Sequence, residues 1–393
     1  MARIYLDNAA TTPVRPEVLE AMAPLLGGGY NPSSLHAEGR AARAAVDGAR
    51  ETVARVLGAT PREIVFTAGG SEADVLAIIG AARGRARAHA ADRGVGAPNP
   101  GHVVTTSIEH HAVLHAVDVL ERDGWRVTRL PVDGNGLVDA NAFAAALTPQ
   151  TAVASVMLAN NETGAVEPVA RLAAIARERG VVFHTDAVQA AGWLPLDVDA
   201  LGVDLLSLSA HKLHGPKGAG ALYVRRGTPL EPLIVGGPQE HGLRAGTENV
   251  AGIAGFATAL ALAEAERAAT APHVAALRDR LQAGIIAAVP DAVVNGAGAP
   301  RLPNIVSVAF ADTPSDALLI RLDLEGIAAS AGSACAAGSL EPSHVIAALG
   351  VPERYRMGVV RFSLSRATTD AEVGEVLAKL PAVLTSVRTP LAV

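Results

Sequence analysis

The sequence predicts an α/β fold, with a large domain built on a mostly parallel, seven-stranded sheet and a smaller α+β domain. Three observations predict it. The chain has 393 residues, enough for one large domain or two. Through its first two thirds, short β-branched apolar runs alternate with helical stretches, the pattern of a parallel sheet covered by helices on both faces. From about Val250 the alternation stops, and long helical stretches with fewer strands follow.

The first part of the chain contains seven runs that we expect to form the sheet. They are residues 63–68, 102–107, 125–132, 152–159, 181–187, 203–210 and 220–225. Helical stretches separate several of them, as at 111–124 and 169–180. Ligands of such a sheet bind at the carboxyl ends of its strands, so the residues after each run are candidates for the site.

The second part is expected to begin with two helices, at 251–268 and 274–289. Strands at 304–310, 326–332 and 359–366 and a last helix near 370–387 follow. Residues 83–101 are rich in Arg, Gly and Pro, which predicts an exposed loop or helix end. We interpret them as a solvated insertion rather than a docking site.

The composition excludes several classes of protein. The formal net charge of -6 gives no basic surface for nucleic acid or an anionic membrane. A single cysteine excludes a disulfide framework within the chain and a cysteine-based zinc site. The first residues lack the pattern of a secretory signal, and no apolar run is long enough to span a bilayer. We expect a cytoplasmic protein with no nucleic-acid or membrane partner.

Lys212 lies just after a buried run, where an α/β sheet places its chemistry. The run at 203–210 ends in Ser209 and Ala210, and Gly and Pro residues follow the lysine. A lysine in this position either binds phosphate or forms an imine. The phosphate-loop pattern GxxxxGK[ST] is absent from the sequence. An imine needs an electron-sink cofactor such as pyridoxal phosphate (PLP), which in turn needs an acid for its ring nitrogen and a phosphate cradle.

Both further requirements have candidates at strand ends. Asp186 ends the run at 181–187, and Gln189 follows three residues later. Gly69, Gly70 and Ser71 join the run at 63–68 to a helix, whose free amides would bind an anion. Ser71 is followed at the spacing of a capping box by Asp74.

Histidines follow another strand. His110 lies at a strand-to-helix junction and is a candidate for stacking on the cofactor ring. His111 and His115 are close to it in sequence, and His211 and His214 flank Lys212. No acidic or cysteine partners cluster with them, so we expect no metal site.

Ten motifs occur in a recognisable order. They are YLDNAATTP (5–13), NPSSLHAEGR (31–40), IVFTAGGSEAD (64–74), IEHHAVL (108–114), NNETG (160–164), HTDAVQ (184–189), SAHKLHGPKG (209–218), RAGTEN (244–249), GSACAAGSLEPSHV (332–345) and RFSLSR (361–366). In these motifs, over nearly its whole length, the chain resembles the cysteine desulfurases of the NifS/IscS type, within the class V aminotransferases of PLP fold type I. The resemblance implies a large PLP-binding domain over 14–258 and a small domain over 1–13 and 259–393.

The resemblance also implies roles for the cofactor residues. Lys212 joins PLP covalently and moves protons once displaced. Asp186 pairs with the pyridinium nitrogen, Gln189 binds the phenolic oxygen, and His110 stacks on the ring as a further catalytic residue. The phosphate is held by Gly70, Ser71, Ser209 and His211.

Three more residues complete the implied site. Asn161 belongs to the cofactor site and, with Arg361, holds the carboxylate of the substrate through a bidentate pair with the arginine. Thr247 reaches the phosphate of a neighbouring subunit, so a homodimer is implied.

Cys335, in SAGSACAAGS (330–339), is the only cysteine of the sequence. By itself a lone cysteine is most often a small buried hydrophobic residue. The resemblance implies instead that its thiolate takes the sulfur of L-cysteine, leaving alanine and a persulfide on the enzyme. An acceptor protein would then receive the sulfur for iron–sulfur cluster assembly, tRNA thiolation or another pathway. Small neighbours such as Gly332 leave this thiol accessible.

Other readings stay open at this point. A selenocysteine lyase or another class V aminotransferase would share the fold, although an aminotransferase would not need Cys335. A binding module on the same fold would be expected to have lost Lys212, Asp186 or Cys335, and the sequence has all three. Val75 stands where the family often has asparagine, and the last residues lack the extended tail by which some relatives bind an iron–sulfur scaffold.

Overall fold

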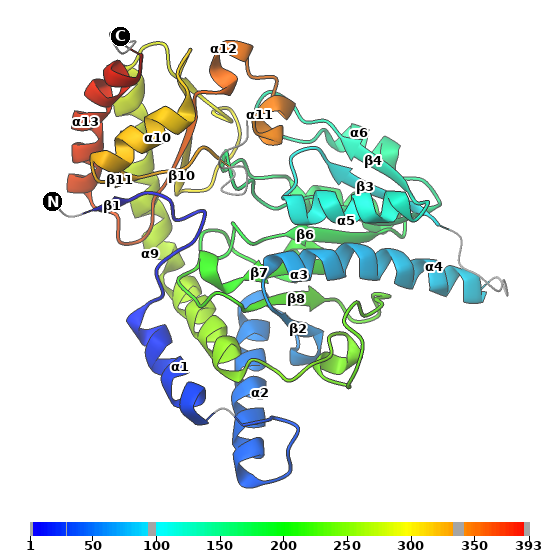
Figure 1. Ribbon diagram of the computed structural model, residues 1–393. Helices are drawn as coiled ribbons and strands as arrows, with labels where there is room; N and C mark the ends of the chain where they lie inside the picture. The colour runs from blue at the N-terminus through cyan, green and yellow to red at the C-terminus, as the bar shows by residue number, and fades with distance from the viewer. Residues whose placement is uncertain (1–2, 29, 93–99, 333–341, 389–393) are drawn as a thin grey trace.

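A seven-stranded sheet forms the centre of the larger unit (Figure 1). The computed structural model describes residues 3–28, 30–92, 100–332 and 342–388. The strand order is β2-β8-β7-β6-β5-β3-β4, and β8 alone runs against its neighbours. The strands are β2 (Ile64–Thr67), β3 (His102–Thr106), β4 (Arg126–Leu130), β5 (Thr151–Ser155), β6 (Val182–Asp186), β7 (Leu205–Ser209) and β8 (Gly220–Val224). The predicted mostly parallel sheet is therefore confirmed.

Successive residues of the strands face opposite sides of this sheet, and helices cover both sides. Val103 and Val153 pack with α5 (His111–Arg122) and with a rod made of α3 (Gly70–Val75), a π-helical turn (Leu76–Gly80) and α4 (Ala81–Asp92). The next residues along the two strands, Val104 and Ala154, face the other side of the sheet. There the cover is α2 (Ala37–Leu57), α7 (Val169–Glu178) and the first part of α9 (Val250–Ala288). All residues of β5, β6 and β7 are buried, which explains their continuous apolar runs.

A second core lies in the smaller unit. Its antiparallel sheet has the order β12-β10-β9, formed by β9 (Val293–Val294), β10 (Ile305–Ala309) and β12 (Val359–Ser363). The strand β1 (Ile4–Tyr5) pairs in parallel with β11 (Ile327–Ala328), so the start of the chain packs in this core through Ile4 and Leu6. The helices α10 (Ser315–Leu324) and α13 (Asp370–Arg388) cover it.

The remaining helices are short or peripheral. They are α1 (Pro16–Gly28), α6 (Ala140–Ala146), α8 (Val198–Leu201), α11 (His344–Ala348) and α12 (Glu353–Arg356). Three-residue 3-10 turns lie at Pro61–Glu63, Ala210–Lys212 and Glu240–Gly242. No helix in the described ranges has the length and apolar character needed to cross a membrane.

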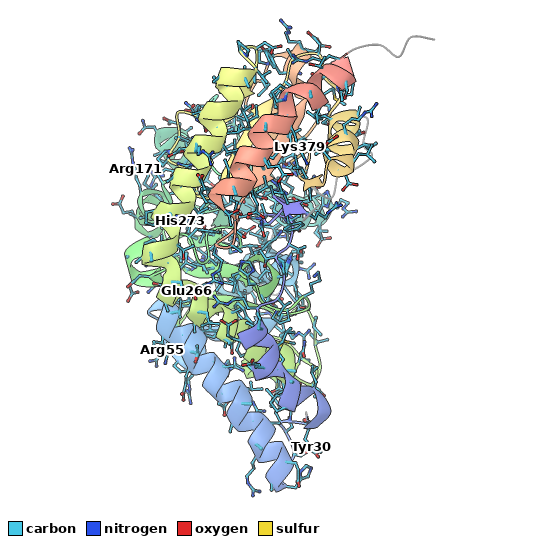
Figure 2. The ribbon with its side chains drawn as sticks, turned by 90° about the vertical axis from the view of Figure 1, so that its left-hand side faces the viewer. Tyr30, Arg55, Arg171, Glu266, His273 and Lys379 are labelled. Atoms are coloured by element: carbon cyan, nitrogen blue, oxygen red, sulfur yellow. The ribbon has the colours of Figure 1, made fainter. Side chains whose placement is uncertain are left out.

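One helix joins the two cores, where two were predicted. The expected helices at 251–268 and 274–289 are a single one, α9, which continues through Pro272. Figure 2 shows α9 passing from the larger to the smaller unit, with Glu266 and His273 near its middle. A proline removes one backbone donor and leaves the carbonyl four residues earlier unpaired. That carbonyl belongs to Ala268, which is exposed, so water can bind it. The domain boundary at 258 proposed from the sequence falls inside this helix.

Residues 83–92 are helical, as the last turns of α4, and their arginines bind this same chain. Arg83 pairs with Asp123, Arg85 donates to the carbonyl of Gly180, and Arg87 pairs with Glu231. Residues 93–99 of the predicted insertion lie outside the described residues. The strand predicted at 326–332 is shorter than expected, because only Ile327 and Ala328 form a strand.

Candidate active site

One cavity of about 600 Å³ opens at the carboxyl ends of the parallel strands. Most of the predicted site residues line it together, although they come from distant parts of the sequence. They are Gly70, Ser71, His110, Asn161, Asp186, Gln189, Ser209, His211, Lys212 and Arg361. Thr247 is exposed and does not line it. Cys335 lies outside the described residues.

Lys212 reaches the cavity from the 3-10 turn that follows β7. Its Nζ donates to the carbonyl oxygens of Ala9 (2.6 Å) and Ala10 (2.8 Å). Gln189 Nε2 donates to the same oxygen of Ala9 at 2.9 Å. The loop at 8–12 therefore forms one wall of the site and fixes the lysine, although sequence reasoning had assigned no role to its residues. The run of small residues in YLDNAATTP was the available signal.

The opposite end of the cavity has the features of an anion site. Gly69 precedes α3 with φ 154° and ψ -175°, a conformation that only glycine adopts readily. The first amides of α3 have no helical partner and face the site together with the side chains of Ser71 and Ser209. His211 binds Thr11 Oγ1 through Nδ1 at 3.2 Å. Burial lowers the pKa of His211 to about 4, and the charges of Lys212 and Lys217 act in the same direction.

The predicted capping box of Ser71 and Asp74 is wrong. The residue at the helix start is Gly69, and no side chain caps it. Glu72 accepts instead from the amide of Ala68, and its carboxylate pairs with Arg244. Asp74 points into the protein, because the face of α3 that carries it packs on the sheet rather than toward solvent.

A cluster of buried polar side chains surrounds Asp186 at one end of the cavity. Its carboxylate accepts from the amide of Val188 at 2.8 Å, and burial raises its pKa to about 6. Behind it, Asp74 Oδ1 lies 3.7 Å from His184 Nε2, and burial raises the pKa of Asp74 well above its ordinary value, with the charge of Asp186 acting in the same direction. The imidazole of His184 bonds to the hydroxyls of Ser155 and Ser207, and burial lowers its pKa to about 3.

His110 is oriented by its own helix. As the N-cap of α5, it accepts at Nδ1 from the amide of Ala112 at 3.1 Å, which places its proton on Nε2. Burial lowers the pKa of His110 to about 4, and the charge of Lys212 contributes. The ring is therefore neutral at physiological pH and can lie against a flat ligand.

Arg361 enters the cavity from β12 of the smaller unit and is 1% exposed. Its Nη2 bonds to Asp7 Oδ1 at 2.9 Å, and its Nη1 donates to the carbonyl oxygen of Asn161 at 2.7 Å. Among the described residues, the buried Nε has no hydrogen-bond partner. This guanidinium retains a free donor for an incoming carboxylate. The contact with Asp7 was not predicted, because 354 positions separate the two residues.

The geometry fits PLP. The cavity brings together an anion-binding helix start, a lysine, a neutral imidazole and a buried carboxyl whose charged form a ring cation would stabilise. Close packing also shapes it, since a Cβ at Gly70 would lie 2.8 Å from Val188 Cγ2. The helix start would hold the phosphate, Lys212 the aldehyde carbon, His110 the ring face and Asp186 the ring nitrogen.

A histidine cluster lies beside the cavity. The ring centroids of His111 and His344 are 4.6 Å apart, and those of His111 and His115 are 5.3 Å apart. His344 Nε2 bonds to the carbonyl oxygen of Glu109 at 2.9 Å. Among the described residues, no three metal-binding side chains are placed to hold an ion.

The comparisons with known families, sequences and structures agree with one another. The family model described as "Aminotransferase class-V" matches residues 4–376. A cysteine desulfurase of Cereibacter sphaeroides is 49% identical over 393 residues, covering 99% of this chain and 97% of that protein. The cysteine desulfurase IscS of Dictyoglomus turgidum is 46% identical over 387 residues, covering 98% and 95%. Among solved structures, a NifS-like protein aligns with a TM-score of 0.87 and 36% identity, covering 98% of this chain and all of that one.

Proposed function

The chain belongs to the aminotransferase class-V family and is a PLP-dependent cysteine desulfurase, and we propose how the residues of its cavity carry out that reaction. The observation that supports the proposal is the meeting of Lys212, Asp186 and His110 with an anion-binding helix start around one cavity. When bound, PLP supplies an electron sink for the amine-bearing carbon of the substrate.

We assign cofactor binding to the residues of the larger unit. Ser71, Ser209 and His211, with the first amides of α3, hold the phosphate. Lys212 Nζ is the point of covalent attachment, and it is already directed by two carbonyl oxygens of the 8–12 loop. Asp186 holds a proton on the ring nitrogen, because a neighbouring cation favours the ionised form of its carboxyl.

Substrate binding is assigned to Arg361 and Asn161. The free Nε of Arg361 and the edge of its Nη2 can receive the carboxylate of L-cysteine as a paired hydrogen bond. The bonds to Asp7 and to the carbonyl of Asn161 fix the plane of the guanidinium before substrate arrives. Lys212 lines the same cavity, and its amine would act as the base that moves a proton at the α-carbon of the substrate.

Cys335 is assigned the role of sulfur acceptor. Its thiolate attacks the sulfur of the substrate, so that an S–S bond forms and the C–S bond breaks. The electron pair of that bond stays on carbon, which takes up a proton and leaves as alanine. The enzyme keeps a persulfide, from which a sulfur acceptor is supplied. We place this activity in the cytoplasm, where thiols remain reduced.

A homodimer is also proposed. Large apolar side chains are exposed near the end of α1 and just before α2: Leu26 is 70% exposed, Tyr30 51% and Leu35 90%. Figure 2 shows Tyr30 at the tip that these two helices form. Thr247 lies on this side of the molecule, because its neighbour Glu248 pairs with Arg43 of α2. A surface of this kind marks a protein interface. We assign Thr247, which is exposed and does not line the cavity of its own chain, to the cavity of a second copy.

The reaction is tested anaerobically with PLP-loaded protein, L-cysteine and a reductant. We expect equal amounts of sulfide and alanine from the wild-type chain. Cys335→Ala should keep the bound cofactor and form neither product at the wild-type rate. Sulfide formation that survives unchanged in this variant would remove Cys335 from the mechanism, and keto-acid formation would indicate an aminotransferase.

A further inference from the structure

A buried carboxyl beside the substrate site has no place in the reaction described above. Glu162 belongs to the NNETG turn after β5 and is 1% exposed. Its Oε2 accepts a hydrogen bond from Ser343 Oγ at 2.6 Å, and its buried Oε1 has no hydrogen-bond partner in the part of the chain that the structure describes. Burial raises the pKa of Glu162, an effect that the bond from Ser343 and the charge of Arg361 oppose. An unpartnered carboxyl oxygen in the interior is unfavourable, so this position needs a compensating role.

The same carboxyl meets the chain on both sides of residues 333–341. Gly332 has φ 102°, and a Cβ there would lie 2.6 Å from Glu162 Oε2, so only glycine fits against this oxygen. Ser343, which Oε2 also binds, caps α11 by accepting from the amide of Val345. A single oxygen atom therefore contacts both described flanks of the segment that contains Cys335.

The two flanks are joined to the substrate site as well. Ser330 exchanges backbone hydrogen bonds with Arg361, at 2.6 and 3.2 Å. Asn161, the neighbour of Glu162 in sequence, accepts from Arg361 Nη1. On the other flank, His344 bonds to the carbonyl of Glu109, next to His110. Glu162 thus lies where the substrate-carboxylate site and the ends of the cysteine segment meet.

We propose that Glu162 is a positioning residue for the sulfur-transfer step, because its carboxylate accepts a hydrogen bond from Ser343 and lies against Gly332, so that it holds the two flanks of the segment that carries the nucleophile. The inference rests on the assignment of Cys335 as sulfur acceptor. Only two residues, 333 and 334, separate Gly332 from Cys335 in the sequence, so we expect the position of this flank to influence the thiol. Glu162 does not line the cavity that is assigned to the cofactor and the substrate.

The experiment compares Glu162→Ala, Ser343→Ala and the double variant. Both single changes remove the hydrogen bond between Ser343 and Glu162, so we expect each to slow persulfide formation about tenfold in single turnover, and the double variant to be no slower than Glu162→Ala. The cofactor absorbance and the KM for L-cysteine should stay near wild type. Glu162→Gln, which keeps an acceptor for Ser343, should recover most of the rate. Glu167→Gln is the matched control, since Glu167 is also buried but bonds to Val138 away from the segment.

A second measurement does not depend on catalysis. In the cofactor-free protein, iodoacetamide labels the single thiol, and the rate of labelling reports its surroundings. Glu162→Ala and Ser343→Ala should change this rate by about threefold or more, to one common value, while Glu167→Gln leaves it unchanged. Additive effects of the two changes, or wild-type rates of persulfide formation and labelling in both, would overturn the proposal. Failure of the assignment itself is recognised separately, by sulfide formation in Cys335→Ala.

Discussion

At the scale of single residues, the site depends on groups whose neighbours determine their protonation. Two lysines, Lys212 and Lys217, line the cavity, and only Lys212 is held by the carbonyl oxygens of the 8–12 loop. Burial lowers the pKa of His110 to about 4 and raises the pKa of Asp186 to about 6. Each of these effects can be tested by a single substitution.

Lys212→Ala should abolish covalent attachment of the cofactor and sulfide formation, while Lys217→Ala keeps both. The reason is position, since the two lysines share the cavity but not the bonds that direct Lys212. Borohydride reduction followed by mass spectrometry identifies the modified lysine. Attachment that persists in Lys212→Ala, or moves to Lys217 with activity intact, would reject the assignment.

The buried Glu109 predicts a pH dependence of stability. Burial raises the pKa of Glu109 to about 8, so in the folded protein its carboxyl is neutral below that pH. The stability that it contributes is complete below its ordinary pKa near 4.5 and is lost as the pH rises through about 8. Glu109→Gln should therefore leave the thermal midpoint of the cofactor-free protein unchanged at pH 5 and raise it at pH 8. The exposed Glu51→Gln, as control, should change neither, and an equal shift at both pH values would contradict the prediction.

At the scale of elements, the cofactor end of the cavity depends on backbone packing against backbone. Gly220 of β8 lies between Thr67 and Ser209 in the sheet. A Cβ at this position would lie 2.6 Å from the carbonyl oxygen of Leu208 and 2.7 Å from Gly69 Cα. The turn that begins α3 can take its place only because this strand has no side chain there.

Gly220→Ala should weaken cofactor binding about tenfold, because the turn at Gly69 must move away from β8. Titration of the cofactor-free protein with PLP, followed by absorbance, measures this affinity. The control is Gly48→Ala on the exposed face of α2, where a Cβ meets no atom within 4 Å. That change should leave PLP affinity unchanged and stabilise the helix by about 1 kcal/mol. Equal affinities in the two variants would contradict the packing argument.

Elements also mark what the sequence can and cannot predict. Lys212, Asp186 and His110 were predicted because each follows a strand that the period of apolar residues reveals. The sequence predicts two helices on either side of Pro272, whereas the structure has the single helix α9. Its two halves pack in the two cores, and this packing outweighs the local tendency of proline to end a helix. The ion pair of Arg361 with Asp7 depends on how the smaller unit folds back, which no pattern along the chain records.

At the scale of the whole molecule, the two units are linked by α9 and by the start of the chain. The 8–12 loop supports Lys212 of the larger unit, while Ile4 and Leu6, a few residues earlier, pack in the smaller one. Arg361 comes from the smaller unit and lines a cavity otherwise built by the larger. Neither unit contains a complete site, and this division was visible in the sequence only through the order of the motifs.

The proposed homodimer gives a prediction at this scale. Leu26→Asp combined with Leu35→Asp places charges on side chains that are 70% and 90% exposed, and should convert the protein to monomers. Light scattering measures the mass, and PLP titration should show weaker binding once Thr247 of a partner is lost. Ile320→Asp on α10, at 62% exposure, is the control and should remain dimeric. A wild-type mass for the double variant would place the interface elsewhere.

The pairing of β1 with β11 has a consequence for synthesis on the ribosome. Ile4 and Ile327 are opposite each other in that pair, yet 323 residues must be added after Ile4 before Ile327 is in the chain. At usual elongation speeds this takes roughly 15–65 seconds, during which the strand has no partner. Leu6, wholly buried in the finished protein, is exposed for the same interval. The nascent chain therefore exposes a short apolar stretch, to which chaperones can bind, until the last quarter of the sequence has emerged from the ribosome.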